Sequence, residues 1–269
     1  MINLLKSLIF LFIKKNNYLT SKPMGSREKY IALHDDCKNN TYSDIYEIEE
    51  KNGYRIDNEY YENLALHTQV CIKKSKLNYQ HGRILYSFIR KYLNDNFNNE
   101  ISKTINIFET GTARGFSSIC MSKAIIDSDK IGHILTCDLI PHNHSMYWNC
   151  IDDNDGKKTR EQLLNNWSAE LELITFLHGE TRKTLLSIGQ SRIHFAFLDA
   201  QHKYKDVILE FEFVCKRQIK GDYIIFDDVT QKLFPGVFNA VKKIEDDGKY
   251  SINYISLSDE RGYAIAIKN

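Results

Sequence analysis

The chain has 269 residues, enough for one complete α/β domain and a smaller additional segment. Its 36 basic and 35 acidic residues give a net charge of +1, so no overall field favours nucleic acid or an anionic membrane. The six cysteines include no Cys-x-x-Cys pair, which argues against a zinc site or a disulfide framework and fits reduced thiols in a cytoplasmic protein.

Residues 1–15 are mostly apolar, but the longest run without a charge covers only residues 7–13. A bilayer-spanning helix needs about 20 apolar residues, and no small-residue cleavage site of a signal peptide follows. The apolar side chains share one helical face. Two interpretations remain open. We favour a helix that packs on the domain or on a second subunit of a homo-oligomer over a helix that lies on a membrane surface.

Residues 16–66 are polar, charged and rich in tyrosine, with no sustained hydrophobic period. They predict an irregular extension with short helices, which is a candidate lid. We place this N-terminal, mostly helical extension at residues 1–75 and the main domain at residues 76–269. The main domain begins with a helix predicted over residues 81–93, where apolar residues recur with helical spacing.

The stretch from residue 105 to 118 reads I-N-I-F-E-T-G-T-A-R-G-F-S-S and predicts a buried strand, a tight turn and a helix. Glu109 ends the strand, and Gly111 and Gly115 bracket the turn. Glycine lets a backbone approach a ligand closely. A carboxylate at this position suits a cationic ligand better than a phosphate, and S-adenosylmethionine, with its ammonium and sulfonium groups, is such a ligand.

Strand and helix patterns alternate along the rest of the chain. Strands are predicted over residues 134–137, 171–177, 193–198 and 222–226, helices over 157–170, 206–217 and 236–244, and a final hairpin over 251–257 and 263–268. This order predicts an α/β fold with a doubly wound, seven-stranded, mostly parallel and Rossmann-like sheet. The hairpin adds an antiparallel edge.

Acidic residues follow the predicted parallel strands. These residues are Glu109, Asp138, Glu180, Asp199 and the pair Asp227 and Asp228. An acidic residue after a strand is often only a turn or helix cap. Because ligands of open α/β sheets bind outside the carboxyl ends of the strands, we expect these carboxylates to converge on one crevice. Like charges at close range repel, so a cationic ligand or a metal should lie between them.

Two partners fit these carboxylates. Asp138, after the second strand, is placed to bind the ribose hydroxyls of a nucleoside. Asp199, Asp227 and Asp228 supply the hard oxygen ligands that Mg²⁺ or a similar ion prefers. His202 comes three residues after Asp199, about one helical turn, and could accept a proton from a substrate hydroxyl.

Several segments together resemble a known family. They are F-E-T-G-T-A-R-G-F-S-S, L-T-C-D, H-G-E-T, F-L-D-A-Q-H-K-Y and Y-I-I-F-D-D-V. They resemble the class I S-adenosylmethionine-dependent methyltransferases. Within that class they resemble the metal-dependent small-molecule and sugar O-methyltransferases, a branch that includes macrocin and mycinamicin O-methyltransferases and cephalosporin-hydroxylase-like proteins. The resemblance runs from about Tyr79 to the C-terminus and does not cover residues 1–75.

The resemblance implies roles for individual residues. The implied cofactor-binding residues are Glu109, Gly111, Thr112, Gly115, Ser117, Asp138, Glu180 and Asp199. The implied metal ligands are Asp199, Asp227 and Asp228. The implied catalytic residues are His202, as the base, and Asp199. The implied cofactors are S-adenosyl-L-methionine and Mg²⁺ or a similar divalent cation.

The resemblance also implies an activity, which is methyl transfer to a hydroxyl of a small molecule or sugar, in polysaccharide or glycosylated-metabolite biosynthesis. The alternative is a non-catalytic S-adenosylmethionine-binding module with a structural or regulatory role. A nucleic-acid substrate is not expected, because the chain has neither a basic stripe nor an N-P-P-Y-type motif. Four aromatic residues, Tyr60, Tyr61, Tyr147 and Trp148, either line a sugar pocket or simply pack.

Overall fold

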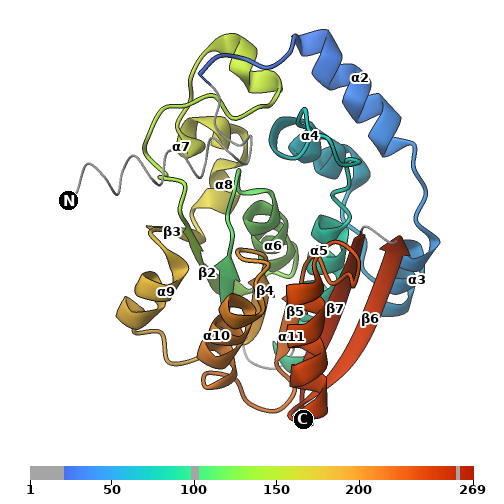
Figure 1. Ribbon diagram of the computed structural model, residues 1–269, viewed down its shortest axis with the longest axis vertical. Coiled ribbons are helices and arrows are strands. Elements are labelled where there is room, and N and C mark those ends of the chain that lie inside the picture. Colours follow the sequence, from blue (N-terminus) through green and yellow to red (C-terminus); the bar gives the residue numbers. More distant parts are fainter. Residues whose placement is uncertain (1–20, 98–102, 259–260) are drawn as a thin grey trace.

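A seven-stranded sheet forms the centre of the computed structural model, which describes residues 21–97, 103–258 and 261–269 (Figure 1). The strand order is β3-β2-β1-β4-β5-β7-β6, with β1 to β5 parallel and β7 antiparallel to both β5 and β6. The strands are β1 Thr104–Thr110, β2 Ile131–Asp138, β3 Ile174–His178, β4 Phe195–Leu198, β5 Tyr223–Phe226, β6 Tyr250–Ser258 and β7 Arg261–Lys268. The predicted Rossmann-like sheet with an antiparallel C-terminal hairpin is confirmed.

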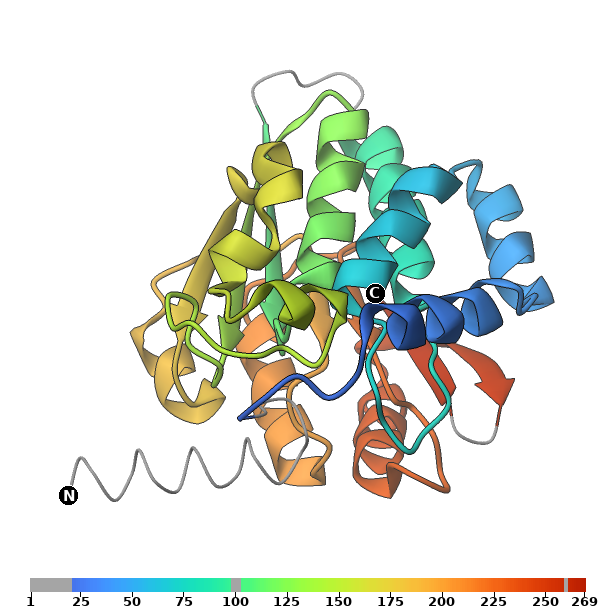
Figure 2. The same ribbon diagram turned by 90° about the horizontal axis from the view of Figure 1, so that it is seen from above.

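Helices cover both faces of the sheet, with α5 and α6 on one face and α10 and α11 on the other (Figure 2). The short strand β4 has apolar side chains on both faces of the sheet, so both faces must be buried. Phe195 and Phe197 belong to the core on the α5 and α6 side, whereas Ala196 and Leu198 belong to the core on the opposite side. The helices of the main domain are α5 His81–Phe97, α6 Phe116–Asp127, η1 Ile151–Asp155, α7 Arg160–Leu163, η2 Asn165–Trp167, α8 Ser168–Leu171, α9 Thr181–Thr184, η3 Leu185–Ser187, α10 Tyr204–Cys215 and α11 Pro235–Asp246.

The extension before α5 is more regular than its sequence predicts, with helices α2 Arg27–Lys38, α3 Ser43–Asn52 and α4 Asn58–Thr68. In α2 the buried residues are Tyr30, His34 and Cys37, which have helical spacing but mixed polarity, so the hydrophobic pattern is weak. Tyr30 belongs to the same hydrophobic core as α5 and α6. Residues 1–15 lie outside the described residues, and both interpretations of them stay predictions. No helix in the described ranges is long and apolar enough to cross a membrane.

The helix expected over residues 157–170 is broken into α7, η2 and α8, and β3 starts at Ile174, three residues later than expected. The chain leaves the helical conformation at Leu164, with ψ 8°, and again at Trp167, with ψ 42°. Between them lie Asn165 and Asn166. Asparagine favours turns over helix interiors, because its amide competes for backbone hydrogen bonds. The helical pattern of apolar residues did not reveal this interruption.

Asn149, in the long loop after β2, holds the segment between α4 and α5 in place. Its side-chain oxygen accepts hydrogen bonds from the Ile72 backbone N–H (3.1 Å) and the Tyr30 hydroxyl (3.1 Å). Its side-chain nitrogen donates to the Ile72 carbonyl (3.0 Å). Asn149 is buried, and its φ of +55° is left-handed, a conformation that asparagine tolerates better than most residues. The amide therefore holds both backbone polar groups of Ile72 and so anchors the 69–78 segment.

We expect Asn149→Ala to lower the free energy of unfolding by about 2–4 kcal/mol, because it leaves the buried Tyr30 hydroxyl and the part-buried N–H and carbonyl of Ile72 without their partner. Urea denaturation would measure the loss. Asn154→Ala is the matched control, since Asn154 is an exposed asparagine in η1, which follows this loop. It should change the stability by no more than about 0.5 kcal/mol. Equal losses in the two variants would show that Asn149 is not an anchoring residue.

Candidate active site at the carboxyl ends of the strands

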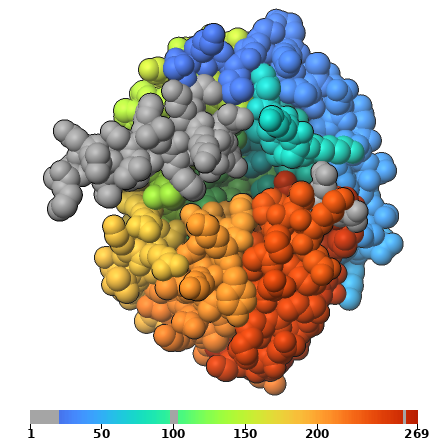
Figure 3. All heavy atoms as spheres, in the orientation of Figure 1, coloured from blue at the N-terminus to red at the C-terminus, as the bar shows by residue number. Residues whose placement is uncertain are grey.

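A cavity of about 470 Å³ opens at the carboxyl ends of the parallel strands. Its wall is built from the glycine turn after β1, the ends of β2, β4 and β5, the start of β7, and the 69–78 segment. In Figure 3 the surface is hollowed between the segments coloured blue to lime and those coloured yellow to red. Sites for small molecules measure about 300–1,000 Å³, so the cavity is large enough for a nucleoside-sized ligand.

The glycine turn packs directly against the end of β4. Gly111 has φ +90°, and a Cβ atom added there would lie 2.3 Å from the backbone oxygen of Asp199. Gly115 has φ +93° and caps the N-terminus of α6. Gly111, Thr112 and Ser117 line the cavity, whereas Gly115 does not. Glycine is therefore required at residue 111 both for its backbone conformation and for the close approach to Asp199.

Glu109 lies beneath the turn and does not line the cavity. Its buried carboxylate accepts hydrogen bonds from the hydroxyls of Ser117, Ser118 and Thr136, the last at 2.5 Å. Burial raises the pKa of Glu109, and these hydroxyl hydrogen bonds oppose the rise. The structure thus gives Glu109 a supporting position under the start of α6, and its direct contact with the methionine part of a cofactor stays a prediction.

Asp138 lines the cavity at the end of β2. Its carboxylate accepts hydrogen bonds from the backbone N–H groups of Ala113 (2.5 Å) and Ile140 (2.7 Å), which joins the end of β2 to the glycine turn. Burial raises the pKa of Asp138, and the positive charge of Arg160 opposes this. Glu180, in contrast, is exposed at the start of α9, 3.5 Å from the Lys183 ammonium, and does not line the cavity. Its predicted contact with adenine also stays a prediction.

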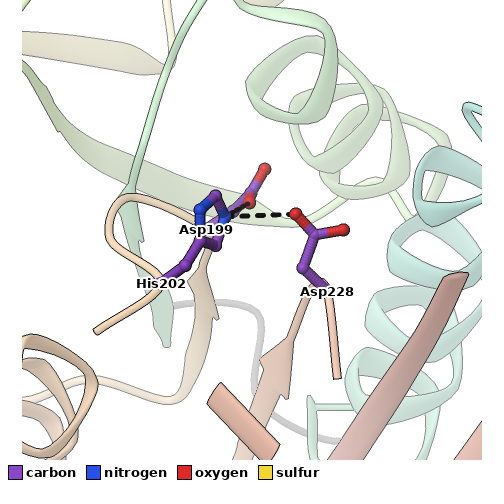
Figure 4. Close-up of side chains that lie close together, drawn as sticks. All are labelled: Asp199, His202 and Asp228. Carbon is purple, nitrogen blue, oxygen red and sulfur yellow. Dashed lines mark ion pairs between the residues drawn. The ribbon is translucent and has the colours of Figure 1, made fainter. Parts of the chain in front are cut away.

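Asp199, His202 and Asp228 face one another across the cavity (Figure 4). Asp199 follows β4, Asp228 follows β5, and His202 lies in the loop that leads to α10. The Nε2 atom of His202 is 3.1 Å from Oδ2 of Asp228 and 3.9 Å from Oδ1 of Asp199. One donor atom from each residue lies within 4.8 Å of the others. Two carboxylate oxygens and one imidazole nitrogen can hold a divalent cation, with water completing its coordination.

Asp227 also lines the cavity but is held differently. Its carboxylate accepts a hydrogen bond from the Asp228 N–H (2.7 Å), and Oδ1 lies 3.5 Å from the guanidinium of Arg261. Burial, followed by the charges of Asp199 and Asp228, raises the pKa of Asp227 well above its usual range. Of the three predicted metal ligands, Asp199 and Asp228 therefore meet at His202, whereas Asp227 lies against Arg261.

Arg261 is a cavity residue that the sequence analysis missed. It is the first residue of β7 and donates to Oδ1 of Asp228 (2.6 Å). The predicted hairpin could have revealed Arg261. A strand that pairs antiparallel with β5 begins beside the end of β5, so its first residues lie near the site. Asp228 has φ +56°, a left-handed conformation that aspartate adopts more readily than most residues.

The protonation of His202 depends on what the neighbouring carboxylates bind. Burial disfavours the charged imidazole, but the nearby carboxylates of Asp199 and Asp228 outweigh this effect and raise the pKa of His202 to about 10. Without a bound cation the site therefore holds a protonated histidine at neutral pH. A divalent cation competes with this proton, since both are stabilised by the same carboxylate oxygens.

The four aromatic residues considered for a sugar pocket do not line the cavity. Tyr61 is buried and donates its hydroxyl to the Tyr79 carbonyl (2.6 Å). Trp148 is buried and donates its indole N–H to the Lys158 carbonyl (2.8 Å). The Tyr60 hydroxyl bonds Glu170 (2.9 Å), and Lys157 lies over the ring of Tyr147, 5.6 Å from its centroid. All four have the contacts of packing residues.

Known proteins share this architecture. Residues 108–229 match a family described as a methyltransferase domain. The structure is similar to an O-methyltransferase from Bacillus cereus in complex with SAH, with 16% identity, a TM-score of 0.52, and 86% of this chain and 93% of that chain covered. The resemblance to class I S-adenosylmethionine-dependent methyltransferases is confirmed. At this identity the structural likeness itself establishes the methyltransferase fold and nothing finer.

Two further proteins are similar to this chain. The O-methyltransferase TomG from Streptomyces achromogenes, involved in tomaymycin synthesis and solved in complex with SAM, has 14% identity and a TM-score of 0.54, with 80% of this chain and 92% of that chain covered. An uncharacterized protein, R132, of Acanthamoeba polyphaga mimivirus is 43% identical over 80 residues. That match covers 28% of this chain and 36% of the viral protein, so it spans about a third of the length of that relative.

Proposed function

We propose that this chain is an S-adenosylmethionine-dependent O-methyltransferase that acts on a hydroxyl of a small molecule or sugar with the help of a divalent cation. One observation carries the proposal: the cluster of Asp199, His202 and Asp228 shares a single cavity with the glycine turn. A proton acceptor, ligands for a cation and a backbone turn suited to a cofactor are thus available to one bound substrate.

The residues around the cavity fit S-adenosylmethionine. Gly111 presents no side chain to the ligand, and the carboxylate of Asp138 can accept hydrogen bonds from ribose hydroxyls. The carboxylates of Asp199, Asp227 and Asp228 give this end of the cavity the negative charge that suits an ammonium and a sulfonium. When bound, the cofactor supplies the methyl group on its sulfonium.

The donor set also fits Mg²⁺ or a similar hard cation, with Asp199 and Asp228 as the carboxylate ligands. When bound, the cation would lower the pKa of the acceptor hydroxyl. In its unprotonated form His202 takes the proton of that hydroxyl at Nε2, and Asp228, whose Oδ2 lies 3.1 Å from Nε2, stabilises the imidazolium that results. The protein otherwise aligns the acceptor oxygen with the methyl group for in-line displacement.

The test combines calorimetry with S-adenosylmethionine and transfer of a labelled methyl group to a library of sugars and small hydroxyl compounds. We expect cofactor binding, transfer to some acceptors in Mg²⁺, loss of transfer in EDTA, and recovery when Mg²⁺ is restored in excess. Transfer that is indifferent to EDTA would assign the aspartates a structural role. Cofactor binding without transfer to any acceptor would favour a non-catalytic binding module, and no binding would contradict both functions.

A further inference from the structure

Lys73 belongs to the 69–78 segment and lines the cavity. Within residues 21–97, 103–258 and 261–269, the Lys73 ammonium has no ion-pair or hydrogen-bond partner. The other cationic side chain at the metal end, that of Arg261, donates to Asp228 at 2.6 Å. Lys73 is therefore an exposed cation at the edge of a binding cavity, and no described residue pairs with its ammonium.

Lys73 lines the same cavity as the residues of the metal end. Asp228, His202 and Arg261 all line it, as does Arg114 of the glycine turn. An acceptor hydroxyl must reach Asp228 and His202 to lose its proton, so the remainder of the acceptor lies close to this wall. Once a divalent cation and a sulfonium are bound, positive charges exceed the carboxylates here, and an anionic acceptor would restore the balance.

The backbone before Lys73 is fixed. Asn149 pairs with both the N–H and the carbonyl of Ile72, at 3.1 and 3.0 Å, and Ile72 directly precedes Lys73. The start of the lysine side chain is thus anchored in advance of ligand binding, and only its own rotamers remain to be ordered. A site anchored in this way loses less entropy when its ligand binds.

We propose that the acceptor carries an oxyanion, either a carboxylate or a phosphate, and that Lys73 binds it. The acceptor is then a uronic acid, a sugar phosphate or a compound of similar charge, with its reacting hydroxyl at His202. This inference rests on the proposed function, since it needs an acceptor at the metal end. It assigns Lys73 to the acceptor and not to the methionine carboxylate of the cofactor, which is the other oxyanion able to enter the cavity.

The test compares Lys73→Met with Lys74→Met. Lys74 is the matched control, because it is exposed as Lys73 is but does not line the cavity. Calorimetry measures the affinity of each protein for S-adenosylmethionine. It then measures the affinity of the SAH- and Mg²⁺-loaded proteins for glucuronate, glucose 6-phosphate and glucose. We expect the wild type and Lys74→Met to bind at least one anionic sugar about 10-fold more tightly than glucose, and Lys73→Met to lose that preference. Thermal melting confirms that both variants are folded.

The two anionic sugars distinguish a carboxylate from a phosphate acceptor. Lys73→Met should bind S-adenosylmethionine as tightly as the wild type, and a selective loss of cofactor affinity would overturn the inference by assigning Lys73 to the cofactor. Equal binding of glucose and both anions by the wild type would overturn it, as would binding of none of the three by protein that still binds S-adenosylmethionine. A wild type that does not bind S-adenosylmethionine would contradict the proposed function itself.

Discussion

His202→Gln is expected to lower the rate of methyl transfer by ~10²–10⁴-fold, the usual contribution of a positioned general base. Glutamine can still donate a hydrogen bond toward Asp228, which lies 3.1 Å from Nε2 of His202, but it cannot take a proton from the acceptor. The loss should appear in kcat. The affinity for S-adenosylmethionine should stay within about twofold of the wild type, because His202 is assigned to the acceptor and not to the cofactor.

Lys203→Gln is the control for this variant. Lys203 is the next residue, is exposed, and does not line the cavity. Its replacement introduces the same side chain in the same loop, and transfer should continue at the rate of the wild type. If His202→Gln transfers methyl groups as fast as Lys203→Gln, another group removes the proton and His202 serves only as a neighbour of Asp228. A loss of S-adenosylmethionine binding in His202→Gln would instead place the imidazole in the cofactor site.

Much of the candidate site could be predicted because parallel strands end at one edge of a sheet. Asp138, Asp199 and Asp228 each follow a strand that the sequence identifies by its buried apolar run, and all three line one cavity. No knowledge of distant contacts was needed, since the direction of the strands alone brings their ends together. His202 could be predicted as well, because it lies only three residues after Asp199.

The position of Glu109 shows a signal that was present in the sequence but not used. Side chains of a strand alternate between the two faces, so Glu109 points to the same face as Ile105 and Ile107. Both isoleucines belong to the core on the α5 and α6 side. Glu109 is accordingly buried under the start of α6, where the hydroxyls of Ser117 and Ser118 bond it, and it does not face the ligand cavity.

Other parts of the site depend on contacts that no local pattern records. Asn149 and Ile72 are far apart in sequence, and nothing in either segment predicts that an asparagine amide will pair with that particular backbone. Lys73, the next residue after Ile72, lines the cavity. The extension was predicted to contain short helices, but their regularity was underestimated for a related reason, since α2 is buried through Tyr30, His34 and Cys37 and not through aliphatic residues. Such positions are decided by tertiary packing, which overrides weak local preferences.

Gly111→Ala is expected to disrupt both cofactor binding and the catalytic cluster. The new Cβ atom would lie 2.3 Å from the backbone oxygen and 2.7 Å from the backbone carbon of Asp199. These are backbone atoms, so contact can be relieved only by moving the glycine turn or the end of β4, which carries Asp199. We expect the affinity for S-adenosylmethionine to fall at least about 10-fold, and the free energy of unfolding to fall by about 2–4 kcal/mol. Calorimetry and urea denaturation measure the two effects.

Gly221→Ala separates the close contact from the backbone conformation. Gly221 has φ +88°, nearly the φ of Gly111, but a Cβ atom added there would meet no atom within 4 Å. Its replacement should therefore show only the cost of a left-handed alanine, about 1–2 kcal/mol, with cofactor affinity unchanged. If both variants lose the same stability and neither loses affinity, the φ angle alone requires glycine at residue 111. If only Gly111→Ala loses affinity, the packing of the turn against Asp199 is what positions the cofactor beside the metal ligands.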